Sequence, residues 1–213
     1  MPTTMATSTK VHNEPPPGIR LRPLLLSDLA TLLDIHDKIF PHGNEDPSLF
    51  YEQMLSNEDS DDKMMTLGAV DSSRPDDKSD EIIGYVVTTK IVNASDSEIA
   101  DNIVAAGESS DKLDNKSLVY VMWLGVLEAY RNRGIGTYLM REVIKYASRI
   151  PTCVGIYLHA VAENKAAIKL YKKLKFKCVR RDVVTLMLGH VRSGLKSVGT
   201  RLRKIKQESQ HRS

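Results

Sequence analysis

The chain has 213 residues, 41% of them hydrophobic, and carries a formal net charge of +3 at pH 7. This length and composition predict a single domain with a substantial core, and the small net charge argues against a nucleic-acid binder. The two cysteines, Cys153 and Cys178, have no metal-binding or disulfide spacing, so we expect a reducing compartment and no bound metal. We expect neither a signal peptide nor a transmembrane helix, because residues 1–17 lack an apolar run and no apolar stretch is long enough to span a bilayer.

The first half of the chain predicts a tail, a strand, two helical segments and a pair of strands. Residues 1–18 are rich in Thr and Pro and are predicted to be disordered. Ser27 and Asp28 are typical of a helix start, and Pro47 opens a second helical turn. The predicted elements are a strand at 19–21, a helix at 27–36, a helical turn at 47–55, and paired strands at 64–70 and 82–91. The charged residues between 58 and 81 lie outside the predicted strand at 64–70; they give a net charge of −6 and are interpreted as solvated loop.

The most informative stretch begins at Tyr120. An apolar run to Val126 predicts a buried strand, and the sequence Arg131-Asn-Arg-Gly-Ile-Gly136 follows it. Apolar residues then recur every four positions up to Pro151, which predicts an amphipathic helix. Glycines in such a turn let the backbone approach a phosphate, and the first N–H groups of the helix point towards it. An ordinary tight turn is the alternative interpretation.

A second strand and helix follow the first pair. Residues 153–161 predict a buried strand, and residues 164–174 predict a short helix. Together the two units resemble the acetyl-CoA core of the GCN5-related N-acetyltransferases (GNAT). The R-x-x-G-x-G sequence at 131–136 matches that superfamily's pyrophosphate loop, and Asn164 with Tyr171 matches its second cofactor motif, N-x-x-A-x-x-x-Y. The resemblance implies an α/β fold with a central mixed sheet, splayed at the acetyl-CoA site and flanked by helices.

The resemblance can be narrowed to one type within this superfamily. Tyr120 before the Leu-Gly-Val strand end, and Tyr-Leu-His at 157–159, resemble the N-terminal (Nα) acetyltransferases. A long insert at about 92–117 is similar to that of the membrane-associated NatF type. The resemblance covers residues 19–181, which we therefore predict to be the acetyltransferase domain, after a tail at 1–18 and before a separate segment at 182–213.

The resemblance also implies roles for individual residues. It assigns general-base catalysis to Tyr120 and His159, with no covalent enzyme intermediate. Cys153 is expected to be a small core residue, and Tyr171 to be either core or close to the CoA sulfur. The residues assigned to the acetyl-CoA site are Leu124, Gly125, Val126, Arg131, Asn132, Arg133, Gly134, Ile135, Gly136, Thr137, Asn164 and Tyr171, and those assigned to the acceptor peptide are Phe40, Pro41 and Met122.

The acceptor implied by the resemblance is the amino terminus of another protein, beginning with Met and a hydrophobic or amphipathic residue. An α-amino group with a pKa near 8 is roughly one-fifth neutral at pH 7.4, whereas a lysine near 10.4 is about one-thousandth neutral. Little base catalysis is therefore needed for an amino terminus. Lysine acetylation by the same fold stays open, as does a truncated product that binds acetyl-CoA without efficient catalysis. Transmembrane proteins with cytosolic amino termini are implied as partners, at the cytosolic face of the Golgi or plasma membrane or in the cytoplasm.

The end of the chain departs from the family pattern. Beyond Arg181 we expect neither the Tyr-rich hairpin that closes over the peptide in NatF-like enzymes nor a final strand. Apolar residues spaced alternately by four and three predict instead a basic amphipathic helix over Asp182 to Gln207, lying on an anionic membrane surface. Docking of this stripe on a bare sheet edge is the alternative. Two further departures are Trp123, expected to crowd the splay, and Lys175, expected to loosen a helix end.

Overall fold

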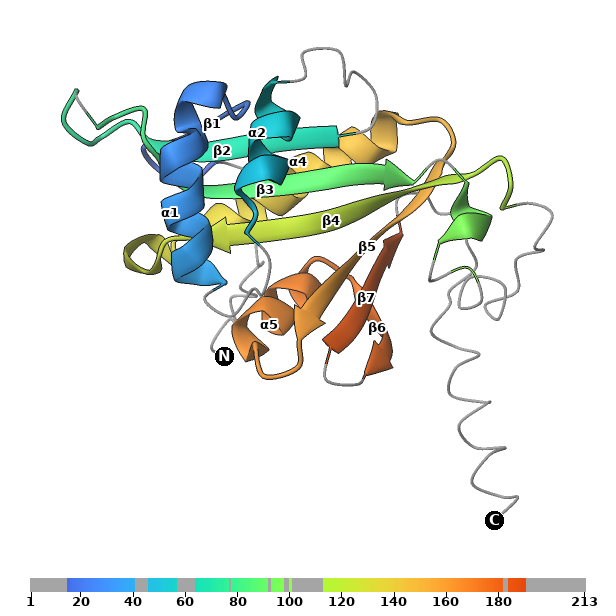
Figure 1. The fold of residues 1–213 in the computed structure, drawn as a ribbon. Helices are drawn as coiled ribbons and strands as arrows, with labels where there is room; N and C mark the ends of the chain where they lie inside the picture. The colour runs from blue at the N-terminus through green and yellow to red at the C-terminus, as the bar shows by residue number, and fades with distance from the viewer. Residues whose placement is uncertain are drawn as a thin grey trace, which may run out of the picture.

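A seven-stranded mixed sheet organises the chain (Figure 1). The computed structural model describes residues 15–40, 46–56, 64–76, 78–91, 93–97, 100, 113–181 and 184–190. The strands are β1 (Ile19–Arg22), β2 (Met64–Asp71), β3 (Ile82–Ile91), β4 (Ser117–Val126), β5 (Cys153–Val161), β6 (Lys177–Arg181) and β7 (Val184–His190). Their spatial order is β1-β2-β3-β4-β5-β7-β6, and only the β4–β5 pair is parallel. The predicted mixed sheet of an α/β fold is confirmed.

Helices cover both faces of this sheet. The α-helices are α1 (Leu29–Ile39), α2 (Ser48–Ser56), α4 (Ile135–Arg149) and α5 (Lys165–Lys173), and the short 3₁₀ helices are η1 (Leu26–Asp28), η2 (Ala94–Asp96) and η4 (Glu128–Tyr130). Figure 1 shows α1 and α2 in front of β2, β3 and β4, with α4 behind them. Two parallel strands that are neighbours in a sheet need a crossover connection, usually a helix, and α4 is this connection between β4 and β5.

Helices α1 and α4 bury the faces that their periodicity predicts. In α4 the buried residues Ile135, Leu139, Val143 and Ala147 pack into one core with the α4-facing side of the sheet. Removing such a face from water is the main source of helix stability in a protein. On the opposite side of the sheet, α1 and α2 bury Leu32, Ile35 and Tyr51 in a second core against β3. The predicted helices and the β2–β3 hairpin are confirmed.

The two ends of the predicted insert meet beside the sheet. The structure describes only 93–97, 100 and 113–117 of this region. The backbone N–H of Ala94 donates to the carbonyl of Lys116 at 2.8 Å, and Ala94 and Leu113 are buried beside Leu118 and Tyr157. The insert therefore leaves and re-enters the domain next to the start of β4.

The predicted C-terminal helix is wrong where the structure describes it. Residues 184–190 form strand β7, which pairs antiparallel with β5 on one side and β6 on the other. The run of Val, Thr, Leu and Met from 183 to 188 suits a strand with neighbours on both sides, and the open edge of β5 supplies the pairing partner. The four-and-three spacing of Val184, Leu188 and Val191 predicted a helix, but the same residues can also be part of a strand, so the spacing alone did not decide between the two. The domain's sheet therefore extends to His190, beyond the predicted boundary at Arg181.

The β6–β7 pair also corrects the expectation that a final strand is missing. Both strands are present, but residues 177–190 contain no tyrosine, so the pair is not the Tyr-rich lid of the family pattern. Gly189 lies under the ring of Phe176, because a Cβ at Gly189 would come within 2.9 Å of several ring atoms. The strand is thus fixed against the end of the α5 unit. Residues 191–207 of the predicted helix lie outside the described residues.

Candidate functional site

Strands β4 and β5 separate halfway along their length. They are paired from Ser117↔Cys153 to Val121↔Leu158, after which β5 continues along β7 up to Val161↔Val184. The second half of β4 stays paired with β3 alone. Figure 1 shows the two arrows diverging towards their C-terminal ends. The predicted splay is therefore present, at the edge where open α/β sheets bind ligands.

Tyr120 and His159 meet at this point. Tyr120 is paired with Tyr157 in the last part of the β4–β5 ladder, and His159 comes just after the ladder ends. The hydroxyl of Tyr120 lies 3.3 Å from Nδ1 of His159, at the long end of the hydrogen-bond range. Both side chains are partly exposed, and the rings of Tyr120 and Tyr157 stack at 4.7 Å. The predicted catalytic pair is thus brought together, with its ring positions supported by a buried tyrosine.

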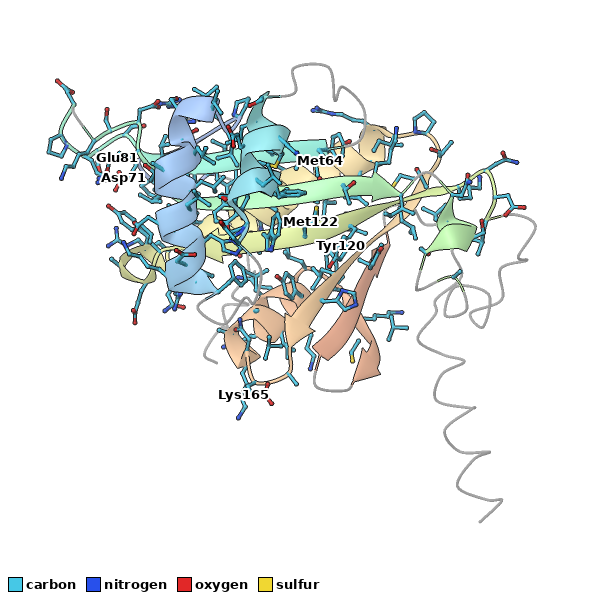
Figure 2. The ribbon with its side chains drawn as sticks, viewed as in Figure 1. Met64, Asp71, Glu81, Tyr120, Met122 and Lys165 are labelled. Atoms are coloured by element: carbon cyan, nitrogen blue, oxygen red, sulfur yellow. The ribbon has the colours of Figure 1, made fainter. Side chains whose placement is uncertain are left out.

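A β-bulge changes the direction of β4 at the point where β4 separates from β5. Thr88 of β3 pairs with Val121 and Val87 pairs with Trp123, so Met122 is an extra residue. The bulge lets consecutive side chains, Met122 and Trp123, pack towards the same core beneath α1 and α2. Figure 2 shows Tyr120 and Met122 side by side on β4 near the divergence from β5. Bulges of this kind bend a strand and end regular pairing, which suits a ligand site.

Beyond the bulge, backbone groups of β4 point into the splay. The N–H of Leu127 donates to the carbonyl of Ile83 in β3 at 2.9 Å. Backbone groups of alternate residues point to opposite sides of a strand, so those of Leu124 and Val126 point away from β3, towards the side that β5 has left. The N–H groups of these two residues are donors of the kind that hold a carbonyl oxygen in acyl transfer.

The glycine-rich stretch forms a turn with left-handed backbone. Asn132 has a φ of 64° and Gly134 a φ of 87°, and Gly134 is the N-cap of α4. Left-handed φ costs an L residue with a Cβ about 1–2 kcal/mol, which explains a glycine and an asparagine at these positions. The first N–H groups of α4 follow this turn directly, in the arrangement that binds phosphate at helix starts.

Two contacts fix the shape of this turn. Nε of Arg131 donates to the carbonyl of Val126 at 3.1 Å, which ties the turn to the end of β4. Arg133 lies over the ring of Tyr130 at 5.0 Å. At Gly136 an added Cβ would lie 3.1 Å from Leu170, so this glycine allows α5 to approach α4 closely. Ile135 is buried and anchors the start of α4, Thr137 is half-buried, and residues 131–134 of the turn are exposed.

The second motif has a structural role that its residues explain. The Asn164 side chain accepts the N–H of Ala167 at 3.0 Å and caps α5. Tyr171 is 6% exposed within the core, and burial raises the pKa of its hydroxyl to about 12. Of the two predicted roles for Tyr171, the structure favours core packing with a neutral hydroxyl.

The end of α5 is closed, so the expected loose end at Lys175 is wrong. The N–H of Phe176 donates to the carbonyl of Tyr171, and that of Lys175 to the carbonyl of Lys172, each at 3.0 Å. These two bonds form a Schellman motif, with Lys175 at the left-handed position and a φ of 69°. Favourable closure bonds and the Tyr171–Phe176 contact hold a lysine where glycine is usual.

The predicted acceptor residues are only partly placed. Phe40 ends α1, with its ring 4.9 Å from His36, and Met122 lies at the bulge. Pro41 lies outside the described residues. Trp123 packs against Phe50 of α2 at 4.9 Å between ring centroids, so it points to the helices and the expected crowding of the splay does not arise. The end of α1 and the bulge are thus the described parts of the predicted acceptor side.

A polar cluster near the end of α1 was not predicted from the sequence. His36, Tyr51 and Tyr85 are buried and lie within hydrogen-bond distance of one another. Desolvation lowers the pKa of His36, although the charge of Asp37 opposes this, and burial raises the pKa of both tyrosines. The three residues are separated by 15, 34 and 49 positions along the chain, so no local spacing could have indicated the cluster.

The remaining predictions concern cysteine, metal and membrane. Cys153 is buried at 1% exposure, and its Sγ lies 3.4 Å from the carbonyl of Gly155, as expected of a core residue. Within the residues that the structure describes, no group of three or more His, Cys, Asp or Glu side chains has the arrangement of a metal site. In the same part of the chain no helix combines the length and apolar character needed to cross a membrane.

A splayed mixed sheet, a glycine-rich turn at the start of the crossover helix and a Tyr–His pair at the splay define the class of the GNAT-fold acyltransferases. The acetyltransferase (GNAT) family matches residues 29–176, and the chain belongs to this family.

Similar proteins support this assignment over most of the chain. The histone acetyltransferase MCC1 of Arabidopsis thaliana is 48% identical over 165 residues, which cover 78% of this chain and 62% of that protein. The chain thus spans less than two-thirds of the length of this relative. N-alpha-acetyltransferase 50 of Danio rerio is 35% identical over 81 residues, covering 37% of this chain and 48% of that protein.

Solved structures agree with the fold. NAA60 of Arabidopsis thaliana in complex with acetyl-CoA is 38% identical, with a TM-score of 0.69 over 81% of this chain and 98% of that one. The same protein with a bisubstrate analogue is 39% identical, with a TM-score of 0.68 over 81% of this chain and 97% of that one. The predicted fold class and resemblance are confirmed.

Proposed function

We propose that this protein transfers an acetyl group from acetyl-CoA to the amino terminus of proteins. The observation that carries the proposal is the Tyr120–His159 pair at the splay, beside outward-pointing backbone N–H groups of β4 and the anion-binding turn at 131–137. The NAA60 structures with acetyl-CoA and with a bisubstrate analogue, and relatives named N-alpha-acetyltransferases, support it.

In this proposal separate groups of the chain bind the pyrophosphate and the thioester of acetyl-CoA. The turn from Arg131 to Thr137 and the start of α4 bind the pyrophosphate through backbone donors. The N–H groups of Leu124 and Val126 hold the thioester oxygen and the negative charge that develops on it. Acetyl-CoA supplies the activated acyl group. The backbone N–H donors of the turn suit its pyrophosphate, and those of β4 suit its thioester oxygen.

Tyr120 and His159 act as the general base. The acceptor amine must be neutral to attack, and after attack its proton has to leave. An α-amine needs little help in reaching the neutral state, so a Tyr–His pair acting through water is sufficient. The buried Cys153 has no part in this route, and the acetyl group passes directly from thioester to amine.

The proposed acceptors begin with Met followed by a hydrophobic or amphipathic residue, with Phe40, Pro41 and Met122 around the first residues of the peptide. The alternative of a truncated domain that binds acetyl-CoA without efficient catalysis relied on a missing Tyr-rich hairpin and a missing final strand. Strand β7 supplies a final strand, whereas residues 177–190 contain no tyrosine.

A second candidate is acetylation of protein lysines. It is favoured by the name of the relative with 48% identity, a histone acetyltransferase. The short β6–β7 connection without tyrosines also leaves the acceptor side without the family's Tyr-rich lid.

One assay separates the two candidates. Purified full-length protein is given acetyl-CoA and either peptides with a free Met-Leu or Met-Val amino terminus or the same peptides with a blocked terminus and an internal lysine. Mass spectrometry then locates the acetyl group. We expect modification of the α-amine at a rate at least tenfold above that of the lysine. Preferential lysine modification would establish the second candidate instead.

We further propose that the protein acts at the cytosolic face of a membrane, on partners that include transmembrane proteins with cytosolic amino termini. Residues 191–213 hold seven Lys or Arg and one Glu, a net charge of +6, together with spaced apolar residues. Basic and apolar residues in such a segment combine attraction to anionic lipids with apolar burial.

A further inference from the structure

A triangle of buried polar atoms joins three elements beside the acceptor side of the site. Nδ1 of His36 in α1 lies 2.8 Å from the hydroxyl of Tyr51 in α2 and 2.9 Å from that of Tyr85 in β3, and the two hydroxyls are 3.0 Å apart. The exposed fraction is 7% for His36 and 0% for both tyrosines. These three atoms therefore satisfy one another in a place that bulk water does not reach.

The protonation state follows from this geometry. A neutral imidazole can accept at Nδ1 from one tyrosine, which in turn accepts from the other, so each of the three atoms of the triangle has a partner. A charged His36 would lose its hydration on burial, and this cost outweighs the attraction of the nearby Asp37. The triangle is consequently a neutral, directional link between α1, α2 and the sheet.

The triangle is connected to Phe40 and, through Trp123, to Met122, the two described residues that are assigned to the acceptor peptide. The carbonyl of His36 accepts the N–H of Phe40 at 2.7 Å, and the two rings lie 4.9 Å apart. On its other side the His36 ring meets Trp123 edge-on at 5.5 Å, next to the bulged Met122. Trp123 also packs against Phe50 and Tyr51 of α2, so the cluster supports the bulge on the side of the helices α1 and α2.

We propose that His36, held by Tyr51 and Tyr85, is a positioning residue that sets Phe40 and the Met122–Trp123 bulge for the acceptor substrate. The proposal rests on the proposed function, because that function gives Phe40 and Met122 their contact with the acceptor. Rigid support matters at such a site, since displacements of about 1 Å at a substrate-positioning group can cost about 10²-fold in rate. The turn at 131–137 leads into α4, whose buried residues belong to the other core of the domain, so we expect the affinity for acetyl-CoA to change little when the triangle is altered.

The test compares four folded variants with the wild-type chain. His36→Leu removes the polar link and keeps an apolar side chain, whereas His36→Asn places an amide near the position of Nδ1. The double variant Tyr51→Phe/Tyr85→Phe removes both hydroxyls and keeps the rings, and it replaces His36→Leu if that protein does not fold. Ile35→Val is the matched control, because Ile35 is the neighbouring buried residue of α1 in the same core.

Three readouts are measured for each protein. Steady-state kinetics give KM for the acceptor peptide and kcat, and calorimetry gives Kd for acetyl-CoA. Trp123 is the single tryptophan of the chain, so its emission reports the cluster directly in the presence and absence of peptide. We expect His36→Leu and the double variant to raise peptide KM about tenfold or more, with Kd for acetyl-CoA within about twofold of wild type. His36→Asn should recover most of the loss, and Ile35→Val should match wild type.

The outcomes distinguish this proposal from the function on which it rests. If wild type acetylates neither amino termini nor lysines, the proposed function fails. If wild type is active and the His36→Leu or double variant keeps its peptide KM, or if Ile35→Val loses as much as they do, the positioning role is overturned. An equal rise in Kd for acetyl-CoA would likewise overturn it, because the triangle would then support the fold as a whole.

Discussion

The hydroxyl of Tyr120 and Nδ1 of His159 lie 3.3 Å apart although the strands that carry them stop pairing at Val121 and Leu158. The last paired residues thus bring the two side chains together, while the separation beyond them leaves room for reactants. A regular ladder would place the pair equally close but would bury the backbone donors of β4 in strand pairing.

The first prediction concerns this pair. Tyr120→Phe and His159→Gln should each lower kcat by about 10²-fold or more, which is within the usual range for general acid–base groups. Stopped-flow or endpoint acetylation assays with a free amino-terminal peptide measure it, and calorimetry should show unchanged acetyl-CoA binding. Cys153→Ala is the control and should keep its activity; an inactive Cys153→Ala protein, with acetyl trapped on the wild-type thiol, would indicate a covalent route instead.

The second prediction concerns the anion-binding turn. Gly134→Val should abolish measurable acetyl-CoA binding, because a β-branched residue is strained at a φ of 87° and the turn must rearrange. Calorimetry on the folded variant tests this. Gly134→Asn is the matched control, since asparagine adopts left-handed backbone more readily, and it should retain weakened binding. Wild-type affinity in Gly134→Val would remove the assignment of the turn.

The third prediction concerns the end of α5. Lys175→Gly should stabilise the protein by about 0.5–1 kcal/mol, because glycine relieves the left-handed penalty at this position while losing some entropy on folding. Urea unfolding with an unchanged slope measures the gain. Lys172→Gly, on the helix one turn earlier, should instead destabilise the protein by a similar amount. A loss of stability in Lys175→Gly would show that the left-handed lysine is not strained.

The fourth prediction concerns pH. Desolvation lowers the pKa of His36 below its ordinary value of about 6.5, so the unfolded chain takes up this proton before the folded one. The contribution of neutral His36 to stability is therefore complete above about pH 6.5 and is lost as the pH falls below it. Urea unfolding followed by Trp123 emission from pH 7.5 to 5.5 should show this decline. His36→Asn should flatten it, and an unchanged slope would contradict the assignment.

The fifth prediction concerns the end of the chain. Deletion after His190 should leave the sheet intact and abolish sedimentation with vesicles that contain anionic lipid, because the basic segment 191–213 is removed. Binding of the full-length chain should weaken as salt is raised. A full-length protein that does not sediment at low salt, or a truncated one that sediments equally well, contradicts the membrane proposal. Deletion from Asp182 would be a poor test, because it also removes strand β7.

The sequence by itself determined the elements whose signals are local. The glycine-rich turn before α4 and the four-residue periodicity of that helix indicated the anion-binding turn, because backbone conformation at Gly134 and burial at Leu139 depend on residues close along the chain. Tyr120 and His159 were identified through their strand ends and the resemblance.

Only the tertiary structure decided features that depend on long-range pairing. The segment from Val184 to His190 has apolar residues at spacings that suit a helix, and the open edge of β5 makes it a strand. The triangle of His36, Tyr51 and Tyr85 comes from three elements distant in sequence. Nor does any local pattern reveal that Met122 is a bulge, because a bulge is defined by the register of β4 against β3. Local sequence thus fixed turns and helices, whereas hydrogen-bond partners between strands and buried polar contacts were set by packing.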